Sequence, residues 1–322
     1  MPGYAVGLDI GGTKIAAGLI DGSARILAHY VSKSHAGQPP EQVVLAALDA
    51  FAEVLRQAGL QPMDVAGAGV GFAGHVHNEA GLVLTSSNLP AWNRHPLRDR
   101  LRQEMGVPVL LDNDANCCAW GEYRYGAGRG SRFLCYVTFS TGCGAGIVIE
   151  GRLYRGALGT AGEIGHTLVD PHGPICSCGK RGCLMSYACG LAISRMACER
   201  IAAGEGTHLR DLCGCSPDHV SGEVVAEAAR QGDPLAREIL ETAGYYLGIG
   251  LSTIVQFLNP DRIVIGGGLT HVGALVMDPC LRGLHENIDP TLIGSAAIAI
   301  SELGEDAGMI GAAALAAETF GG

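Results

Sequence analysis

Residues 4–31 read YAVGLDIGGTKIAAGLIDGSARILAHYV, which is an apolar strand, a Gly/Thr-rich turn, a second apolar strand and an Asp-Gly turn into a third strand. This layout predicts a three-stranded β-meander. Residues 134–156, LCYVTFSTGCGAGIVIEGRLYRG, repeat the layout with a Glu-Gly turn. Each glycine-rich turn joins strand to strand, whereas a dinucleotide-binding fingerprint or a Walker A loop joins strand to helix. The sequence therefore predicts neither of those nucleotide sites.

Helices and strands alternate around the two meanders. Apolar residues at helical spacing predict an amphipathic helix that ends at Gly59, and a helix opened by Pro96 precedes a strand that ends at Leu111. In the second half, Asp233 caps a long helix whose first residue is Pro234. Buried strands are expected within residues 65–74 and 261–270, and a closing helix within residues 305–320. The pattern indicates an α/β protein with two lobes.

Composition and charge restrict the partners. The 322 residues are 48% hydrophobic and 17% charged, which is typical of a globular chain that buries a full core. The formal charge is −10 and no basic run is present, so nucleic acid is not an expected partner. The first residues carry no export signal, and no apolar run of about 18 residues follows. We expect a cytoplasmic protein without a membrane segment, whose 12 cysteines are reduced or bind metal.

Both glycine-rich turns could hold phosphate, because they leave backbone N–H groups uncovered. The residues concerned are Gly11, Gly12 and Thr13 in the first turn and Thr141, Gly142, Gly144 and Gly146 in the second. Asp9 ends the strand before the first turn and could hold hydrated Mg²⁺. The alternative is that both turns are simply tight hairpins. The duplication and the position of Asp9 favour a polyphosphate site.

A group of polar residues follows a buried strand. Asp112, Asn113 and Asp114 lie where this strand gives way to a helix, which is the usual place for chemistry in an open α/β sheet. A carboxylate there can accept the proton of a substrate hydroxyl. Asp114 could instead be only the N-cap of a helix that begins at Ala115. The nearby phosphate turns favour the catalytic interpretation.

One imidazole and three thiols lie within a short loop-rich stretch. They belong to His166, Cys176, Cys178 and Cys183. Four such ligands satisfy tetrahedral Zn²⁺ and leave no open position, so we expect a structural zinc site. His172 lies in the same stretch and is a rival ligand. The remaining cysteines, including Cys117 and Cys118, are interpreted as small buried hydrophobic residues.

Motifs spread over nearly the whole chain resemble those of the ROK family (repressors, open reading frames and kinases) of sugar kinases. In order, they are DIGGTK, NLPAW, DNDAN, STGCGAG, GEIGH, CSCGKRGC, NPDRIVIGGG and DAGMIGAA. The resemblance implies an actin-like, RNase H-like fold with central mixed sheets and a cleft between two lobes. Residues 1–115, joined by a closing helix at about 305–322, would form the smaller lobe. Residues 116–304 would form the larger lobe with the zinc loop.

The resemblance also implies roles for individual residues. Asp114 would take the proton from the sugar 6-hydroxyl, and Asn113 would orient neighbouring ring hydroxyls. His166 would touch the sugar and bind zinc through its other nitrogen, so that zinc fixes a substrate loop and does no Lewis-acid work. The implied substrate-binding residues are Gly74, Asn88, Asn113, Asp114, Glu163, His166 and Met185. The residues implied to hold ATP and Mg²⁺ are Asp9, Gly11, Gly12, Thr13, Lys14, Thr141, Gly142, Gly144, Gly266, Gly267 and Gly268.

Two positions depart from the family pattern on the sugar side. Met185 stands where the family usually has a glutamate that bonds two sugar hydroxyls, and Phe72-Ala73-Gly74 replaces the usual Pro-Gly loop. A thioether cannot accept two strong hydrogen bonds, which would cost a sugar about 1.5 to 3 kcal/mol of binding. Compensating contacts, a substrate that is apolar or differently substituted at that edge, or a deliberate substitution would each explain Met185. Alternatively, Met185 faces the core and the register has shifted.

The resemblance implies an ATP-dependent kinase for the 6-hydroxyl of glucose or of an N-acetylhexosamine such as N-acetylmannosamine. A kinase for a cyclitol or modified sugar is the alternative that Met185 favours. A sugar-sensing, non-catalytic member of the family is a third possibility. Such repressors carry an N-terminal DNA-binding segment, whereas here the first meander begins at residue 4. A homodimer or homotetramer is expected from the resemblance alone.

Overall fold

The computed structural model describes residues 3–35, 37–86, 89, 91–205, 207–212 and 220–321. The chain divides into two compact units. The first comprises residues 1–136, 145–162 and 301–322, and the second comprises residues 137–144 and 163–300. These bounds differ from the lobe bounds expected from the sequence, which stay a prediction.

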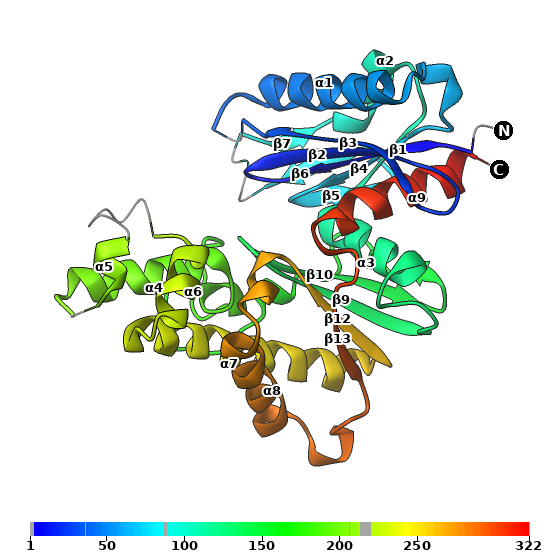
Figure 1. Cartoon of the computed structure of the whole chain (residues 1–322). Helices are drawn as coiled ribbons and strands as arrows, with labels where there is room; N and C mark the ends of the chain where they lie inside the picture. Colours follow the sequence, from blue (N-terminus) through cyan, green and yellow to red (C-terminus); the bar gives the residue numbers. More distant parts are fainter. Residues whose placement is uncertain are drawn as a thin grey trace. The chain divides into compact units, whose positions relative to one another are not determined.

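The first unit is built on a five-stranded mixed sheet in the order β3-β2-β1-β4-β8 (Figure 1). The predicted first meander is confirmed: β1 (Ala5–Ile10), β2 (Lys14–Ile20) and β3 (Ile26–Lys33) pair antiparallel. The strands β4 (Ala68–Phe72) and β8 (Val109–Asn113) extend the sheet parallel to β1. The carboxyl ends of β1, β4 and β8 therefore share one edge.

The expected end of β8 at Leu111 is wrong. Strand pairing continues for two more residues, because Asp112 and Asn113 pair with Gly71 and Phe72 of β4. A small antiparallel sheet was not predicted from the sequence. Its strands are β5 (His75–His77), β6 (Leu82–Thr85) and β7 (Asn93–His95).

Helices cover both faces of the first sheet. In Figure 1, α1 (Pro40–Ala58) and α2 (Leu97–Met105) lie over one face, and α3 (Asp114–Tyr125) and α9 (Ala307–Phe320) lie under the other. The predicted stop at Gly59 is confirmed, since this residue is left-handed with φ 69°. The closing helix begins two residues later than expected, because Gly304–Asp306 form a 3-10 turn (η7).

Glycines let α9 rest directly on the sheet backbone. A Cβ added at Gly7 of β1 would lie 1.9 Å from the carbonyl oxygen of Met309. At Gly69 of β4 it would lie 1.8 Å from the carbonyl oxygen of Ala312. No Cβ tolerates such distances, so only glycine allows this helix-to-strand approach.

The second five-stranded sheet has the order β11-β10-β9-β12-β13. The predicted second meander is confirmed as β9 (Phe133–Phe139), β10 (Cys143–Ile149) and the short β11 (Arg152–Leu153). The strands β12 (Arg262–Gly266), which was expected, and β13 (Ala297–Ile300), which was missed, run parallel to each other. The division between the two units falls within β9 and β10.

Helices make up most of the second unit. The predicted long helix is α7 (Pro234–Leu258), and Asp233 caps it by accepting a 2.9 Å hydrogen bond from the backbone N–H of Ala236. It packs along α8 (Ala274–Asn287), as Figure 1 shows. The other helices are α4 (Gly190–Ala202), α5 (Leu209–Leu212) and α6 (Gly222–Arg230). The short 3-10 turns of both units are η1 (Pro62–Asp64), η2 (Ile164–His166), η3 (Leu184–Ser186), η5 (Gly268–Val272), η6 (Pro290–Leu292) and η7 (Gly304–Asp306).

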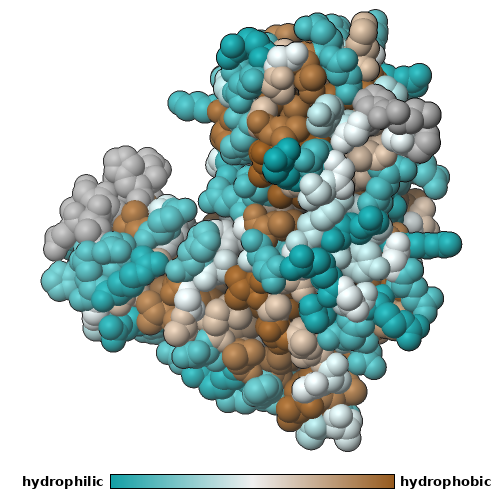
Figure 2. Space-filling view, turned by 45° about the vertical axis from the view of Figure 1, so that its right-hand side comes forward, coloured by the Kyte–Doolittle hydropathy of each residue, from teal (hydrophilic) through white to brown (hydrophobic). Residues whose placement is uncertain are grey.

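An apolar hollow lies between α7, α8 and β13. It is lined by side chains that include Val255, Leu284, Ile288 and Ile293. Figure 2 shows hydrophobic surface at the lower edge of the molecule, where Figure 1 places the chain between α8 and β13. None of the predicted site residues lines this hollow. Among the described helices, none is both long and apolar enough to cross a membrane.

Candidate active site and metal centre

The turn between β8 and α3 presents Asp114. The interpretation of Asp114 as the helix N-cap is wrong, because Asn113 is the cap. The Asn113 Oδ1 accepts hydrogen bonds from the backbone N–H groups of Ala115, at 2.9 Å, and Asn116, at 3.2 Å. The Asn113 Nδ2 donates to the Oδ1 of Asp114 at 2.8 Å. A neighbouring residue thus does the capping and also holds the carboxylate of Asp114.

Asn113 also reaches the loop after β4. Its Nδ2 donates a second hydrogen bond, of 3.0 Å, to the carbonyl oxygen of Gly74. Both amide hydrogens and both lone pairs of Oδ1 are therefore used inside the chain. A direct contact between Asn113 and a sugar stays a prediction. The predicted substrate residue Asn88 lies outside the described residues.

Asp112 is buried directly behind this turn, with 1% of the residue exposed. Its Oδ1 accepts hydrogen bonds from the Asn113 backbone N–H at 2.8 Å and from the Asn116 Nδ2 at 2.9 Å. Its Oδ2 accepts a 2.7 Å hydrogen bond from the Arg155 Nε and lies 2.6 Å from the Arg155 Nη2. Four donors satisfy the buried carboxylate. The sequence did not predict this role of Arg155, since no local pattern connects residues 43 positions apart.

Asp9 stands at the same edge of the sheet, at the carboxyl end of β1. Burial raises its pKa to about 6, although the nearby Lys14 ammonium acts in the opposite direction. Its carboxylate lies against the first turn of α9, where a Cβ added at Gly308 would be 2.8 Å from Oδ2. Burial raises the pKa of the Cys118 thiol, and the carboxylates of Asp9 and Asp114 raise it further. Both carboxylates therefore act on one side chain of α3.

The first glycine turn, Gly11–Thr13, is a tight connection between β1 and β2. The Gly11 N–H donates to the carbonyl oxygen of Lys14 at 3.0 Å, and the Thr13 carbonyl oxygen accepts from the Ser34 N–H at 3.1 Å. The Lys14 ammonium forms an ion pair with Glu305. Lys14 was predicted to contact phosphate, and such a contact requires it to leave Glu305.

The second glycine turn belongs to the second unit and gathers other predicted residues around it. The Ser140 N–H donates to the Gly142 carbonyl oxygen at 3.1 Å, and the Ser140 carbonyl oxygen accepts from Gly190 at 2.7 Å. A Cβ added at Gly267 would lie 2.5 Å from the Phe139 carbonyl oxygen, and this glycine has φ +100°. The structure thus brings the predicted phosphate turn and the glycines after β12 together.

Met185 lies in η3 beside this second turn. It is half-buried, and the alternative interpretations of Met185 stay predictions. Its Sδ is 3.9 Å from the position that a Cβ at Gly142 would take. A thioether, rather than a carboxylate, therefore borders the turn.

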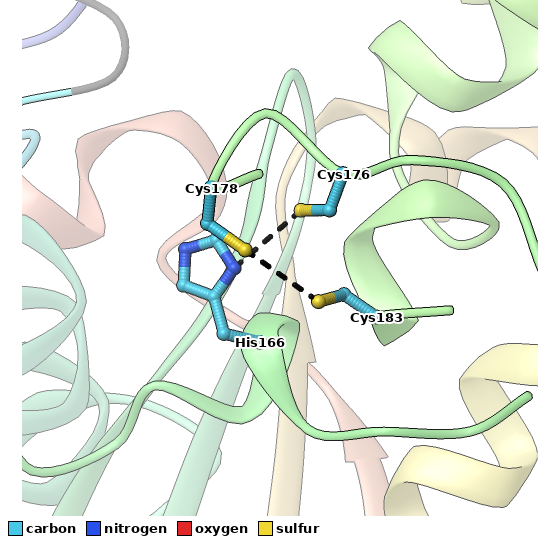
Figure 3. A group of neighbouring side chains, drawn as sticks. All are labelled: His166, Cys176, Cys178 and Cys183. Carbon is cyan, nitrogen blue, oxygen red and sulfur yellow. Dashed lines mark hydrogen bonds between the residues drawn. The ribbon is translucent and has the colours of Figure 1, made fainter. Parts of the chain in front are cut away.

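Four predicted metal ligands converge in the second unit (Figure 3). The donor atoms of His166, Cys176, Cys178 and Cys183 all lie within 4.8 Å of one another. The Cys178 and Cys183 sulfurs are 3.6 Å apart, and the Cys176 sulfur is 3.6 Å from the His166 Nδ1. Tetrahedral zinc with Zn–S bonds of about 2.3 Å separates its sulfur ligands by roughly 3.7 Å, so this donor set fits Zn²⁺. The rival ligand His172 is exposed and does not belong to the group.

Local backbone turns build this centre. The Cys176 N–H donates to the Lys180 carbonyl oxygen at 2.7 Å, and Gly179 closes the turn with φ +84°. A Cβ added at Gly182, which has φ +68°, would lie 1.5 Å from the Asp170 carbonyl oxygen. Burial opposes ionisation of Cys176, but hydrogen bonds from Cys178 and the other ligands lower its pKa to about 6. This favours the thiolate form that metals bind.

The metal centre is directly connected to the predicted sugar-binding residue Glu163. Glu163 precedes η2, and its carbonyl oxygen accepts a 3.0 Å hydrogen bond from the His166 N–H. His166 turns Nδ1 toward the thiols, which leaves Nε2 on the opposite side of the ring. Fixing His166 therefore also fixes the backbone at Glu163.

Two five-stranded sheets, each containing a β-meander and parallel strands, in a chain of two compact α/β units define the actin-like class of two-lobed proteins. The chain belongs to the ROK family, whose model matches residues 5–319. The predicted family and fold class are confirmed.

Individual relatives match along almost the full chain. A glucokinase of Streptomyces coelicolor is 36% identical over 332 positions, covering 98% of each chain. The crystal structure of a ROK glucokinase from Streptomyces griseus, in complex with glucose and AMPPNP, is 37% identical with a TM-score of 0.86, covering 98% of this chain and 100% of that one. A xylose repressor of Caldicellulosiruptor bescii is 28% identical over 97% of this chain and 78% of its own length.

Proposed function

We propose that this chain is an ATP-dependent kinase that phosphorylates the primary hydroxyl of a hexose. One observation carries the proposal. Asn113 caps α3 and holds the Oδ1 of Asp114, so the carboxylate at the end of β8 is kept in place without serving as the cap itself. The similarity to the two Streptomyces glucokinases supports the same activity, and the AMPPNP in one of them supports ATP as the donor.

In the proposed reaction, Asp114 accepts the proton of the sugar 6-hydroxyl while that oxygen attacks the γ-phosphorus of ATP. The bond from phosphorus to the ADP oxygen breaks, and ADP leaves with the electron pair. Phosphoryl transfer depends mainly on positioning and on neutralising phosphate charge. Backbone N–H groups of Gly11–Thr13 and of Thr141–Gly144 would bind phosphate oxygens. Asp9 would hold Mg²⁺, which neutralises phosphate charge when bound.

Zinc would have a structural role in this enzyme. When bound, it would hold the loop that contains His166 and the three cysteines, with no open position for chemistry. Glu163 and the Nε2 of His166 would then bind sugar hydroxyls from a fixed backbone. Each side chain would position substrate and would exchange no proton with it.

The relatives favour glucose as the substrate, whereas Met185 favours a second candidate. A half-buried thioether beside Gly142 offers no strong acceptor to a pair of sugar hydroxyls. A cyclitol, or a hexose modified at that edge, would lose less by this substitution than glucose would. N-acetylmannosamine and other N-acetylhexosamines are included in the same test.

A sugar-sensing function is the alternative from a different class. It is raised by the xylose repressor relative, of which the chain covers 78%. A sensor would bind sugar without turnover, so ATP hydrolysis and sugar phosphate formation discriminate the two functions. The expected homodimer or homotetramer stays a prediction.

The test is ADP release from Mg-ATP with glucose, mannose, allose, N-acetylglucosamine, N-acetylmannosamine and several cyclitols. We expect turnover with glucose or with one N-acetylhexosamine, reduced roughly 10²- to 10⁴-fold in Asp114→Asn because a general base is lost. The matched control is Asp99→Asn, which changes an exposed carboxylate on α2 and should leave turnover unchanged. Turnover only with a cyclitol would select the second candidate. Sugar binding without turnover would replace the kinase by a sensor.

A further inference from the structure

The buried pair of Asp112 and Arg155 has no part in the proposed chemistry, yet it lies directly behind Asp114. The Asp112 carboxylate is 1% exposed and the Arg155 side chain is 25% exposed. Two guanidinium nitrogens converge on one carboxylate oxygen, at 2.6 and 2.7 Å. By contrast, the side chains of the ion pair Arg132–Glu150, which lie at the open end of the β9–β10 hairpin, are 71% and 61% exposed. Because the Asp112 carboxylate is buried, removing its Arg155 partner would leave a buried charge without a counter-charge, which is strongly destabilising.

A continuous series of hydrogen bonds connects this pair to the proposed base. The oxygen of Asp112 that does not meet Arg155 accepts the Asn113 backbone N–H at 2.8 Å and the Asn116 amide at 2.9 Å. The Asn113 side chain in turn donates to the Asp114 Oδ1 at 2.8 Å. The orientation of the Asp112 carboxylate therefore sets the position of the first turn of α3.

Arg155 is held in place by its own loop. The Tyr154 N–H donates to the Ile147 carbonyl oxygen at 2.8 Å, and the Ala161 N–H donates to the Arg155 carbonyl oxygen at 3.0 Å. Gly159, with φ +78°, packs so closely that a Cβ there would lie 2.6 Å from the Val76 carbonyl oxygen. The guanidinium thus reaches Asp112 from a closed loop anchored to β5 and β10.

We propose that Arg155, acting through the buried carboxylate of Asp112, is a positioning residue for the catalytic base Asp114. This inference rests on the proposed kinase function. Without the guanidinium, Asp112 loses two of its four donors and becomes a buried charge without its cation. The carboxylate then turns toward water, and this rotation breaks its bonds to Asn113 and Asn116. Asp114 shifts as a result, and a shift of about 1 Å at a catalytic group costs on the order of 100-fold in rate.

The test is the kinetics of Arg155→Ala. We expect kcat to fall roughly 10- to 100-fold, while the KM for Mg-ATP stays within about twofold, because the pair acts through Asn113 and Asn116 on the turn that presents Asp114. Guanidinium chloride at tens of millimolar, compared with equal sodium chloride, is expected to restore part of kcat, since the site is partly open to solvent. The control Arg132→Ala removes an exposed arginine of the same unit and should show neither loss nor rescue. Should Arg155→Ala fail to fold, Arg155→Lys retains the charge and is expected to show an intermediate kcat.

Two outcomes overturn the inference: an unchanged kcat in Arg155→Ala, or a loss that guanidinium does not restore at all. Crystal structures of the wild type and of Arg155→Ala supply a readout that needs no activity. A displaced Asp114 carboxylate in the variant supports the inference, and an unmoved one overturns it. If the wild type phosphorylates no sugar, the proposed function fails while this structural comparison still decides the positioning role.

Discussion

The turn that presents Asp114 and the loop that carries His166 hold their functional residues in different ways. At the turn, the chain supplies every contact: Asp112 takes four hydrogen bonds and Asn113 caps the helix. In the loop, Cys176, Cys178 and Cys183 converge with His166 in a stretch whose regular structure is limited to short 3-10 turns and isolated bridges. The loop brings together four donors that fit one Zn²⁺ ion.

The turn and the loop therefore owe the positions of their side chains to different parts of the structure. The turn joins a parallel strand of the mixed sheet to a helix, so its geometry depends on the folding of the whole first unit. The loop depends on local ligands, so its geometry should depend on a metal ion and should be lost without unfolding the rest. Damage to the turn should therefore appear in global stability, whereas damage to the loop should appear in local order.

Metal removal is expected to have the largest effect. Stripping zinc with a chelator, or changing Cys183→Ser, should expose the segment between Thr167 and Cys183 to proteases and lower kcat/KM for the sugar at least about 100-fold. Zinc sites of this type supply about 10 to 16 kcal/mol of local binding energy. Proteolytic mapping, metal analysis and kinetics measure the effect. A metal-free protein with an intact loop and full activity would refute it, and Cys198→Ser on α4 controls for loss of a thiol.

The next largest effect should follow from changing Asp112→Asn. The new amide turns a donor toward Arg155, and a half-buried guanidinium loses its buried counter-charge, which should cost about 3 kcal/mol of folding free energy. Urea unfolding at pH 7 measures the loss. The control Glu150→Gln breaks an exposed pair and should cost about 0.5 kcal/mol or less. Equal losses in both variants would remove the distinction between the buried and the exposed pair.

The smallest effect, and one of opposite sign, is expected for Asp9→Asn. The folded-state pKa of Asp9 is about 6, above its ordinary 3.8, so folding favours the protonated acid. That stabilisation is complete below about pH 4 and is lost as the pH rises through 6. The neutral asparagine should therefore stabilise the protein by about 2 kcal/mol at pH 8 and by little at pH 4. Thermal unfolding between these pH values measures it, and parallel curves would contradict it.

The same Asp9→Asn variant should lose kinase activity, because an amide binds Mg²⁺ poorly. If the variant is more stable but inactive, Asp9 serves function and lowers the stability of the folded protein. The two acids at this sheet edge thus contrast with each other. Four donors satisfy Asp112, whereas burial raises the pKa of Asp9 to about 6.

Local sequence patterns predicted much of this molecule. Both meanders, α1 and the cap at Asp233 follow from alternation, helical periodicity and capping chemistry, which neighbouring residues determine. The ligand set of the metal centre followed from its short spacing. The end of β8 and the cap at Asn113 were misjudged, because both depend on pairing with β4 rather than on the DND stretch itself. Arg155 could not be found, since its partner is 43 residues away and only the folded loop brings it there.

The return of the chain to the first unit has a consequence for synthesis on the ribosome. Helix α9 packs on β1 and β4 through Gly7 and Gly69, yet its residues are translated only after the whole of the second unit. The buried carboxylate of Glu122 also waits for this late segment, because Ser301 and Leu303 donate to it at 2.5 and 2.9 Å. Until about residue 320 has emerged, β1 and β4 keep an apolar face uncovered. The first unit, whose strands are translated before the second unit, is therefore completed only after the second unit has been made, and the nascent chain has to protect that face in the meantime.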